Sequence, residues 1–210
     1  MSTGRALVLV DIQVDFAEGG SLAVDGGAAV ASRATERVLA DVAAPAGERR
    51  YDVVVATADW HHDPGDHWAA PGTEPDFVHS WPVHCRVGTP GADFHPGLGP
   101  ALPHVDEVFR KGWDAAAYSG FEGRAAGEGG GAGDAAGDGA ELLADWLRAR
   151  GITDLDVCGI ATDYCVRATV LDARREGFAV AVLHDTVAGV APGSTEAAVA
   201  EMRQAGATVT

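Results

Sequence analysis

The chain has 210 residues, 47% of them hydrophobic, so it can bury a substantial core as one domain. Its formal net charge of -16 argues against nucleic acid or an anionic membrane as a partner, because phosphate binding requires clustered Lys and Arg. No apolar run approaches the ~20 residues of a membrane helix, no secretion signal is visible, and three cysteines favour free thiols over disulfides. We therefore expect a cytoplasmic globular protein with residues 1–210 in a single domain.

Polar side chains follow the first three predicted strands directly. Residues 6–10 are all apolar, and Asp11 comes next. Residues 51–56 form the second predicted strand and lead into a stretch rich in Asp and His, while residues 105–110 lead into Lys111. In open parallel sheets the carboxyl ends of the strands share the edge at which ligands bind. These side chains are therefore expected to lie close together.

The remaining elements alternate between strands and helices. Apolar residues spaced three or four apart predict the helices, and short apolar runs predict the strands. Further strands are expected at residues 156–159, 178–183 and 207–209, and helices at residues 28–42, 141–150, 162–176 and 195–205, the last capped by Ser194. This alternation predicts a three-layer α/β/α fold with a mainly parallel sheet of about six strands and helices on both faces.

Two segments depart from this alternation. Residues 71–103 are rich in Pro and Gly and predict a long irregular loop, and loops of that length inside a domain are more often functional than not. Residues 123–139 are dominated by Gly and contain no large apolar side chain. Their spacing fits neither a dinucleotide-binding loop nor a P-loop. We interpret them as a surface insertion.

Cys165 is the candidate nucleophile. An apolar run ends at Gly159, and helical spacing begins at Thr162, which places Cys165 in the first turn of a helix. Unpaired backbone N–H groups and the helix dipole at that position favour the thiolate. Taken singly, a cysteine is usually a core residue, Asp11 a loop carboxylate and Lys111 a surface charge. Their shared position beyond predicted strands indicates a nucleophile with a proton acceptor and a stabilising cation.

A second set of residues has the chemistry of a metal site. One carboxylate and three imidazoles offer the O and N ligands that Zn²⁺, Fe²⁺ or Mn²⁺ prefer. The four candidates are Asp59, His61, His67 and His84. Cys85 follows the last of them but is better explained as a packed thiol, and the spacing alone is only moderately specific.

Six motifs in order along the chain resemble the nicotinamidase/pyrazinamidase group of the isochorismatase-like hydrolase family. The metal pattern is the part that indicates nicotinamidase, since the Lys and Cys elements recur across the family. The motifs are Asp11-X-Gln-X-Asp-Phe16, Thr57-X-Asp-Trp-His61 with His67, Trp81-Pro-X-His-Cys85, Gly88-Thr-Pro-Gly91, Lys111-Gly112 and Gly159-Ile-Ala-Thr-Asp-X-Cys-Val166.

The resemblance implies a thiol mechanism for hydrolysis of nicotinamide to nicotinic acid and ammonia. Asp11 would take the proton of Cys165, and Lys111 would hold the pair in its charged form. The thiolate would attack the carboxamide carbon to form a thioester. Backbone N–H groups of Ala161 and Cys165 would stabilise the oxyanion, and the peptide bond between Ile160 and Ala161 would be cis.

The resemblance also implies one divalent metal ion, which is Zn, Fe or Mn. Asp59, His61, His67 and His84 would hold that ion, and it would bind the pyridine nitrogen. Phe16, Trp81 and Ile160 would line the substrate slot. Pyrazinamide would be a second substrate, the reaction would recycle nicotinamide for NAD synthesis, and the protein would be a monomer or a homo-oligomer.

Two other functions compete with this interpretation. Another amidase of the same family would act on a carbamoyl, ureido or different carboxamide substrate, and the four metal ligands count against it. A non-enzymatic thiol or metal sensor would use Cys165 as a redox switch, but such a sensor usually needs a resolving thiol. No second thiol is adjacent to Cys165 in the sequence.

Overall fold

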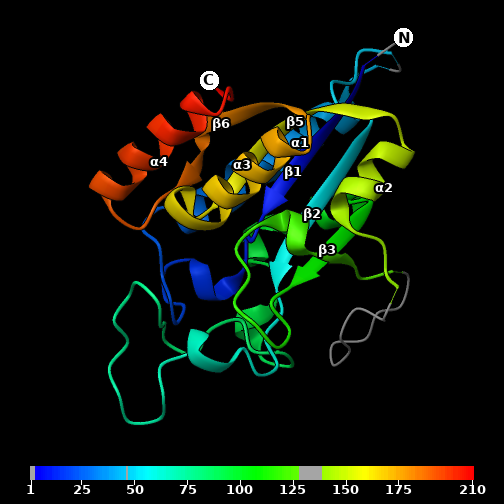
Figure 1. Ribbon diagram of the computed structural model, residues 1–210. Helices are drawn as coiled ribbons and strands as arrows, with labels where there is room; N and C mark the ends of the chain where they lie inside the picture. The colour runs from blue at the N-terminus through cyan, green and yellow to red at the C-terminus, as the bar shows by residue number, and fades with distance from the viewer. Residues whose placement is uncertain (1–2, 46, 128–138) are drawn as a thin grey trace.

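A seven-stranded sheet forms the middle layer of the computed structural model, which describes residues 3–45, 47–127 and 139–210 (Figure 1). The strand order is β4-β3-β2-β1-β5-β6-β7, and every neighbouring pair is parallel except β3 and β4. Val8 in the centre of β1 lies opposite Val55 of β2 and Val157 of β5. The strands are β1 (Gly4–Val10), β2 (Val53–Asp59), β3 (Glu107–Lys111), β4 (Arg124–Ala125), β5 (Ile152–Ile160), β6 (Ala179–Ala188) and β7 (Thr208–Val209).

In the part of the chain that the structure describes, four α-helices cover the sheet, and short helical turns lie in the loops. No helix among the described ranges combines the length and the apolar character needed to cross a membrane. The α-helices are α1 (Gly27–Ala43), α2 (Leu143–Ala149), α3 (Arg167–Arg175) and α4 (Pro192–Gln204). A π-helical turn spans Thr162–Val166, and 3-10 turns span Val14–Phe16, Gly65–His67, Pro90–Ala92, Pro96–Leu98, Leu102–His104 and Gly120–Glu122.

The side chains of β1 show why helices pack on both faces of the sheet. Successive side chains of a strand point to opposite faces. Leu7 and Leu9 pack into the core that α1 completes, whereas Ala6, Val8 and Val10 pack into the core that α2, α3 and α4 complete. Figure 1 shows α1 behind the sheet and the other three helices in front of it. The predicted three-layer fold is confirmed.

Most predicted elements are present, with two differences. The sheet has one more strand than expected, because Arg124–Ala125 at the start of the predicted insertion pairs antiparallel with β3. Ser194 does not cap the last helix. That helix begins at Pro192 after Ala191, and Ser194 lies inside its first turn. Of the predicted insertion at 123–139, residues 128–138 lie outside the described residues.

The topology brings the two halves of the sheet together at one point. From β1 the chain proceeds through α1 to β2 on one side, and β5 pairs with β1 on the other side. Such a reversal in strand order is where open α/β sheets bind ligands. Gly159 allows β5 to approach β1 closely there, because a Cβ at this position would collide with the backbone of Val10, and its φ of 128° favours glycine.

A charged cluster at the opposite end of the sheet contributes to stability. The carboxylate of Asp156 is fully buried and accepts hydrogen bonds from Arg5 Nη1 (2.7 Å), Arg50 Nε (2.7 Å) and Tyr51 Oη (3.0 Å). Burial alone would raise the pKa of Asp156, but the bonds from Arg50 and Tyr51 outweigh burial and lower it. The folded state therefore binds the ionised carboxylate more favourably than the unfolded state does.

We predict that Asp156→Asn lowers the free energy of unfolding by about 2 kcal/mol at pH 7, because hydrogen bonds to a charged group are lost. The folded pKa lies below the unfolded value of about 3.9, so the wild-type advantage is present above that pH and is lost as the pH falls through the folded pKa. Urea unfolding at pH 7 and pH 3 measures this difference. The exposed Asp145→Asn is the control, and an equal effect of both variants would contradict the prediction.

Candidate active site

Four buried side chains converge at the carboxyl ends of four strands. Asp11 directly follows β1, Asp59 ends β2, Lys111 ends β3, and Cys165 lies in the π-helical turn after β5. The ligand atoms of Asp11, Asp59 and Cys165 lie within 4.8 Å of one another. The structure thus brings together the three residues predicted as a catalytic group, and it adds a carboxylate that the sequence had assigned to the metal site.

The ammonium of Lys111 lies at the centre of this group. Its Nζ is 2.9 Å from Asp11 Oδ2 and 3.8 Å from Cys165 Sγ, and it contacts Asp59 Oδ1. It also donates to the carbonyl of Ala117 at 3.2 Å. Burial would lower the pKa of Lys111, but the two carboxylates raise it well above its ordinary value. Lys111 is therefore a permanent cation that neutralises part of the buried negative charge.

Asp11 has the properties of a proton acceptor. Its Oδ1 accepts a hydrogen bond from Thr57 Oγ1 at 2.5 Å, which leaves Oδ2 facing Lys111. Burial and the neighbouring Asp59 raise the pKa of Asp11 despite the opposing charge of Lys111. A carboxylate with a raised pKa holds a transferred proton more firmly, as a general base requires.

The helix position of Cys165 was predicted to favour its thiolate, and the buried surroundings of the sulfur oppose that preference. Burial raises the pKa of Cys165 well above its ordinary value, and the carboxylates of Asp11 and Asp59 add to this against the single ammonium of Lys111. Cys165 is a thiol until a base removes its proton.

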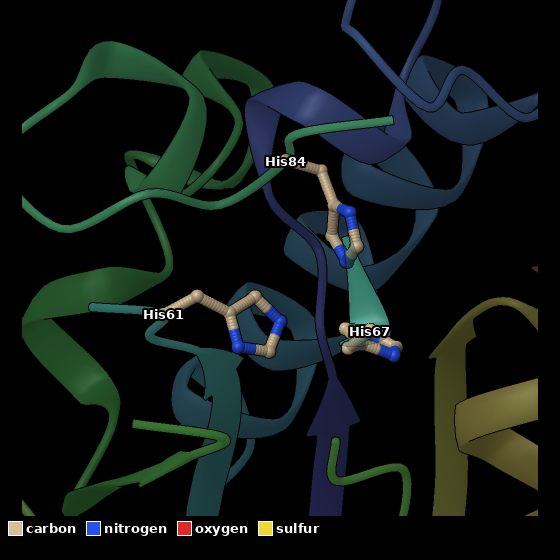
Figure 2. Close-up of side chains that lie close together, drawn as sticks. All are labelled: His61, His67 and His84. Atoms are coloured by element: carbon tan, nitrogen blue, oxygen red, sulfur yellow. The ribbon is translucent and has the colours of Figure 1, made fainter. Parts of the chain in front are cut away.

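Three buried imidazoles lie beside the carboxylates and face one another (Figure 2). Their ligand atoms all lie within 4.8 Å of one another. His61 follows β2, His67 ends the turn Gly65–His67, and His84 comes from the long loop. Burial and the neighbouring imidazoles lower the pKa of His67 to about 4, so that ring is neutral at physiological pH and offers a lone pair.

Backbone carbonyls fix which nitrogen points into the cluster. Nδ1 of His61 donates to the Gly112 carbonyl (2.5 Å), and Nδ1 of His84 donates to the Pro82 carbonyl (2.7 Å), so each Nε2 carries a lone pair. Buried Nε2 of His61 and Nδ1 of His67 have no hydrogen-bond partner among the described residues. Orphaned imidazole nitrogens aimed at one point fit a transition-metal ion.

Asp59 joins the imidazoles to the lysine group. Its Oδ2 is 3.6 Å from His61 Nε2 and 3.9 Å from His84 Nε2, while Oδ1 contacts Lys111. Burial would raise the pKa of Asp59, but the ammonium of Lys111 holds that pKa far below its usual range. The ionised carboxylate can therefore serve a metal ion and the ammonium at the same time.

Gln13 explains how Asp59 is held in place. Its amide oxygen accepts from the Asp59 N–H at 2.8 Å, and its amide nitrogen donates to the carbonyls of Asp59 and Ala92, each at 2.8 Å. This side chain is fully buried, so all of its bonds are within the protein. The motif that begins at Asp11 contains Gln13, but the sequence alone assigned no role to it.

Asp15 fixes the loop that carries His84. Its Oδ2 accepts from the Cys85 N–H at 2.7 Å, and Cys85 has a positive φ of 45°. A Cβ at position 91 would collide with this carboxylate, which explains the glycine there. Cys85 itself is buried, and burial raises the pKa of its thiol, in agreement with its interpretation as a packed residue.

A pocket opens above Cys165 and the imidazoles. Phe16 and Trp81 line it as predicted, together with Ala161. Ile160 does not line the pocket, because its fully buried side chain belongs to the core beneath. The peptide bond between Ile160 and Ala161 is cis, as the resemblance implied.

Two tyrosines of the pocket were not predicted. Tyr118 accepts a hydrogen bond from Trp81 Nε1 at 3.1 Å, and the ring of Tyr164 lies edge-on to Trp81 with centroids 5.0 Å apart. Tyr118 follows Lys111 in an irregular segment without a recognisable pattern. Tyr164 directly precedes Cys165, so its position in the motif was the available signal.

Comparisons with known proteins agree with this geometry. Residues 5–210 match the isochorismatase domain family. The nicotinamidase/pyrazinamidase of Mycobacterium tuberculosis is 51% identical, over 96% of this chain and 95% of that protein. Similar solved structures are the pyrazinamidase of Pyrococcus horikoshii in complex with zinc (35% identity, TM-score 0.74, 98% of both chains) and PnC1 from L. infantum in complex with nicotinate (32%, 0.77, 100% of this chain and 93% of that chain). The chain therefore belongs to the isochorismatase family.

Proposed function

We propose that this protein is a nicotinamidase, which hydrolyses nicotinamide to nicotinic acid and ammonia and also accepts pyrazinamide. The observation that carries the proposal is one aromatic pocket lined both by Cys165 and by His67 and His84, two members of the cluster of three imidazoles. A reacting carboxamide and a ring nitrogen can then be bound at the same time. The names and bound ligands of the relatives support the same substrate class.

The reaction begins with proton transfer from Cys165 to Asp11. Lys111 stabilises the ion pair that results, since its ammonium contacts Asp11 and lies 3.8 Å from the sulfur. The thiolate attacks the carboxamide carbon, and the C=O electron pair moves onto oxygen. Protonated Asp11 then gives its proton to the leaving nitrogen, so that ammonia departs and a thioester remains. Asp11 deprotonates the water that hydrolyses this thioester.

The proposed oxyanion donors are the backbone N–H groups of Ala161 and Cys165. Ala161 lines the pocket beside the sulfur, and its carbonyl accepts the N–H groups of Tyr164 and Val166, so its backbone is tied to the turn of the nucleophile. Removing one such donor typically raises a barrier by about 3 kcal/mol.

The residues proposed to hold one divalent metal ion are Asp59, His61, His67 and His84. A bound Zn, Fe or Mn ion would supply a Lewis acid for the pyridine nitrogen and thereby orient the ring. Phe16 and Trp81 would enclose the ring between apolar faces. Ile160 would support Ala161 from the core, since its own side chain does not reach the pocket.

The thiol-sensor alternative has little support among the described residues. All three cysteines are free and buried, and burial raises the pKa values of Cys85 and of Cys158, the latter to about 12. We retain the cytoplasm as the proposed compartment and nicotinamide recycling for NAD synthesis as the proposed role.

Ammonia release from purified protein tests the proposed function directly. Nicotinamide, pyrazinamide and a ureido substrate are compared before and after chelation and after addition of Zn²⁺, Fe²⁺ or Mn²⁺. The proposal is supported if nicotinamide and pyrazinamide are hydrolysed and if this turnover requires the metal. Turnover of the ureido compound alone would assign the protein to another amidase activity of the family.

We predict that Cys165→Ala lowers kcat for nicotinamide by a factor of about 10⁴ or more, because no other thiol among the described residues lines the pocket. Steady-state ammonia release measures the loss, and thermal unfolding shows whether the fold is retained. The matched control is Cys158→Ala, which removes a buried thiol from the core and is expected to retain turnover. Substantial turnover by Cys165→Ala would exclude the thioester mechanism.

A second prediction concerns His84→Ala. Loss of one of three imidazoles is expected to weaken Zn²⁺ binding by more than about 100-fold. Competition with a chromophoric chelator measures the affinity without any activity assay. His79→Ala is the control, because His79 is exposed and outside the cluster. Unchanged metal affinity in His84→Ala would remove His84 from the metal site.

A further inference from the structure

Asp163 is a buried carboxylate in the turn that carries Cys165, and the mechanism above does not use it. Its side chain accepts hydrogen bonds from the Val190 N–H at 3.0 Å, the Ala191 N–H at 3.4 Å and Ser194 Oγ at 2.5 Å. Only 7% of the residue is exposed. Val190 and Ala191 lie in the segment that joins β6 to α4, and Ser194 lies in the first turn of α4.

The contacts of Asp163 also explain why Ser194 does not cap α4. The carboxylate lies at the N-terminal end of that helix, where a negative charge is favourable. Ser194 donates to Asp163 and to the Ala191 carbonyl at 3.1 Å from inside the first turn. Asp163 thus ties the start of α4 to the turn that carries Cys165, although it lies 28 positions before Ala191 in the sequence.

This segment forms one wall of the pocket. Val190 lines the pocket beside the turn of Cys165, to which its N–H is bonded through Asp163, yet 48% of Val190 remains exposed. A half-exposed valine gains little from packing, so its place depends mainly on its backbone bonds. The segment also lies close against α4, because a Cβ at Gly189 would be 3.0 Å from Cβ of Thr195.

We infer that Asp163 is a positioning residue for the planar aromatic amide: it holds Val190 over the ring from the same turn that presents Cys165. This inference rests on the proposed function and extends it to a determinant of substrate binding. Because one rigid turn carries both the nucleophile and the anchor of the wall, the ring and the sulfur keep a constant relative position. Asp163 acts through Val190 and has no role in the bond-making steps.

The inference predicts an effect on KM more than on kcat. In Asp163→Ala the wall is released, and KM for nicotinamide rises about tenfold, similar to the loss of one apolar contact in a substrate pocket. The change in kcat is expected to stay below about threefold. Asp163→Asn keeps a carbonyl acceptor for the Val190 N–H and recovers part of the lost affinity.

A double-mutant cycle with Val190→Ala tests whether Asp163 acts through the wall. Val190→Ala alone raises KM, and adding Asp163→Ala to it is expected to raise KM no further. The inference would be overturned if KM of the double variant rose by the product of the two single-variant increases. It would also be overturned if Asp163→Ala lowered kcat and left KM unchanged. Ser194→Ala removes the hydrogen bond from Ser194 to Asp163 and is also expected to raise KM. Ser32→Ala on α1 is the matched control.

Hydrogen exchange gives a readout that needs no substrate. The amide hydrogens of Val190 and Ala191 are expected to exchange at least about tenfold faster in Asp163→Ala and in Ser194→Ala than in wild type. Unchanged exchange would overturn the positioning role of Asp163 even if the enzyme is a nicotinamidase. Faster exchange in a protein that does not hydrolyse nicotinamide would support the contact of Asp163 with Val190 and would reject the proposed substrate.

Discussion

The charge of Lys111 is the constraint on which the rest of the site depends. Two carboxylates and a thiol are buried within a few ångströms of one another, and isolated charges in such surroundings carry a large desolvation penalty. A single ammonium that contacts Asp11, Asp59 and Cys165 makes this arrangement possible. One positive charge cannot fully compensate three acidic groups. The sulfur therefore stays protonated, and Asp11 has a raised affinity for a proton.

This shared charge couples two sites that the sequence presents as separate. Asp59 uses one oxygen for Lys111 and directs the other to the imidazoles. A positive ion among the imidazoles would thus alter the field at Asp11 and Cys165 as well as bind a ring nitrogen. Gln13 keeps Asp59 between Lys111 and the imidazoles, because its side chain is hydrogen-bonded to both the N–H and the carbonyl of Asp59. Binding and proton transfer belong to one electrostatic unit.

The sequence predicted functional residues well where they come directly after a regular strand or helix pattern. Strand ends located Asp11, Lys111 and Cys165, since parallel strands bring their carboxyl ends to one edge of the sheet. The spacing of the histidines, together with the family resemblance, located the imidazoles. The strand β4 was not predicted, because it has only two residues and no periodicity can be seen in so short a run.

Features that depend on tertiary contacts were not predictable in the same way. Tyr118 enters the pocket from an irregular segment, and Val190 enters from a loop whose position is set by Asp163. The side chain of Ile160 is fully buried in the core although its neighbour Ala161 lines the pocket. The protonation of Cys165 depends on the sum of burial and three neighbouring charges, which only the folded structure reveals.

The two outermost strands have a consequence for how copies of this chain can associate. β4 and β7 are each two residues long, so both margins of the sheet end in strands with very few backbone groups to offer. Long open margins invite strand addition between molecules and the aggregation that follows, and shortening the terminal strands is one way in which proteins avoid it. Among the residues that the structure describes, the edges of the sheet therefore offer few backbone groups for strand addition between copies of this chain.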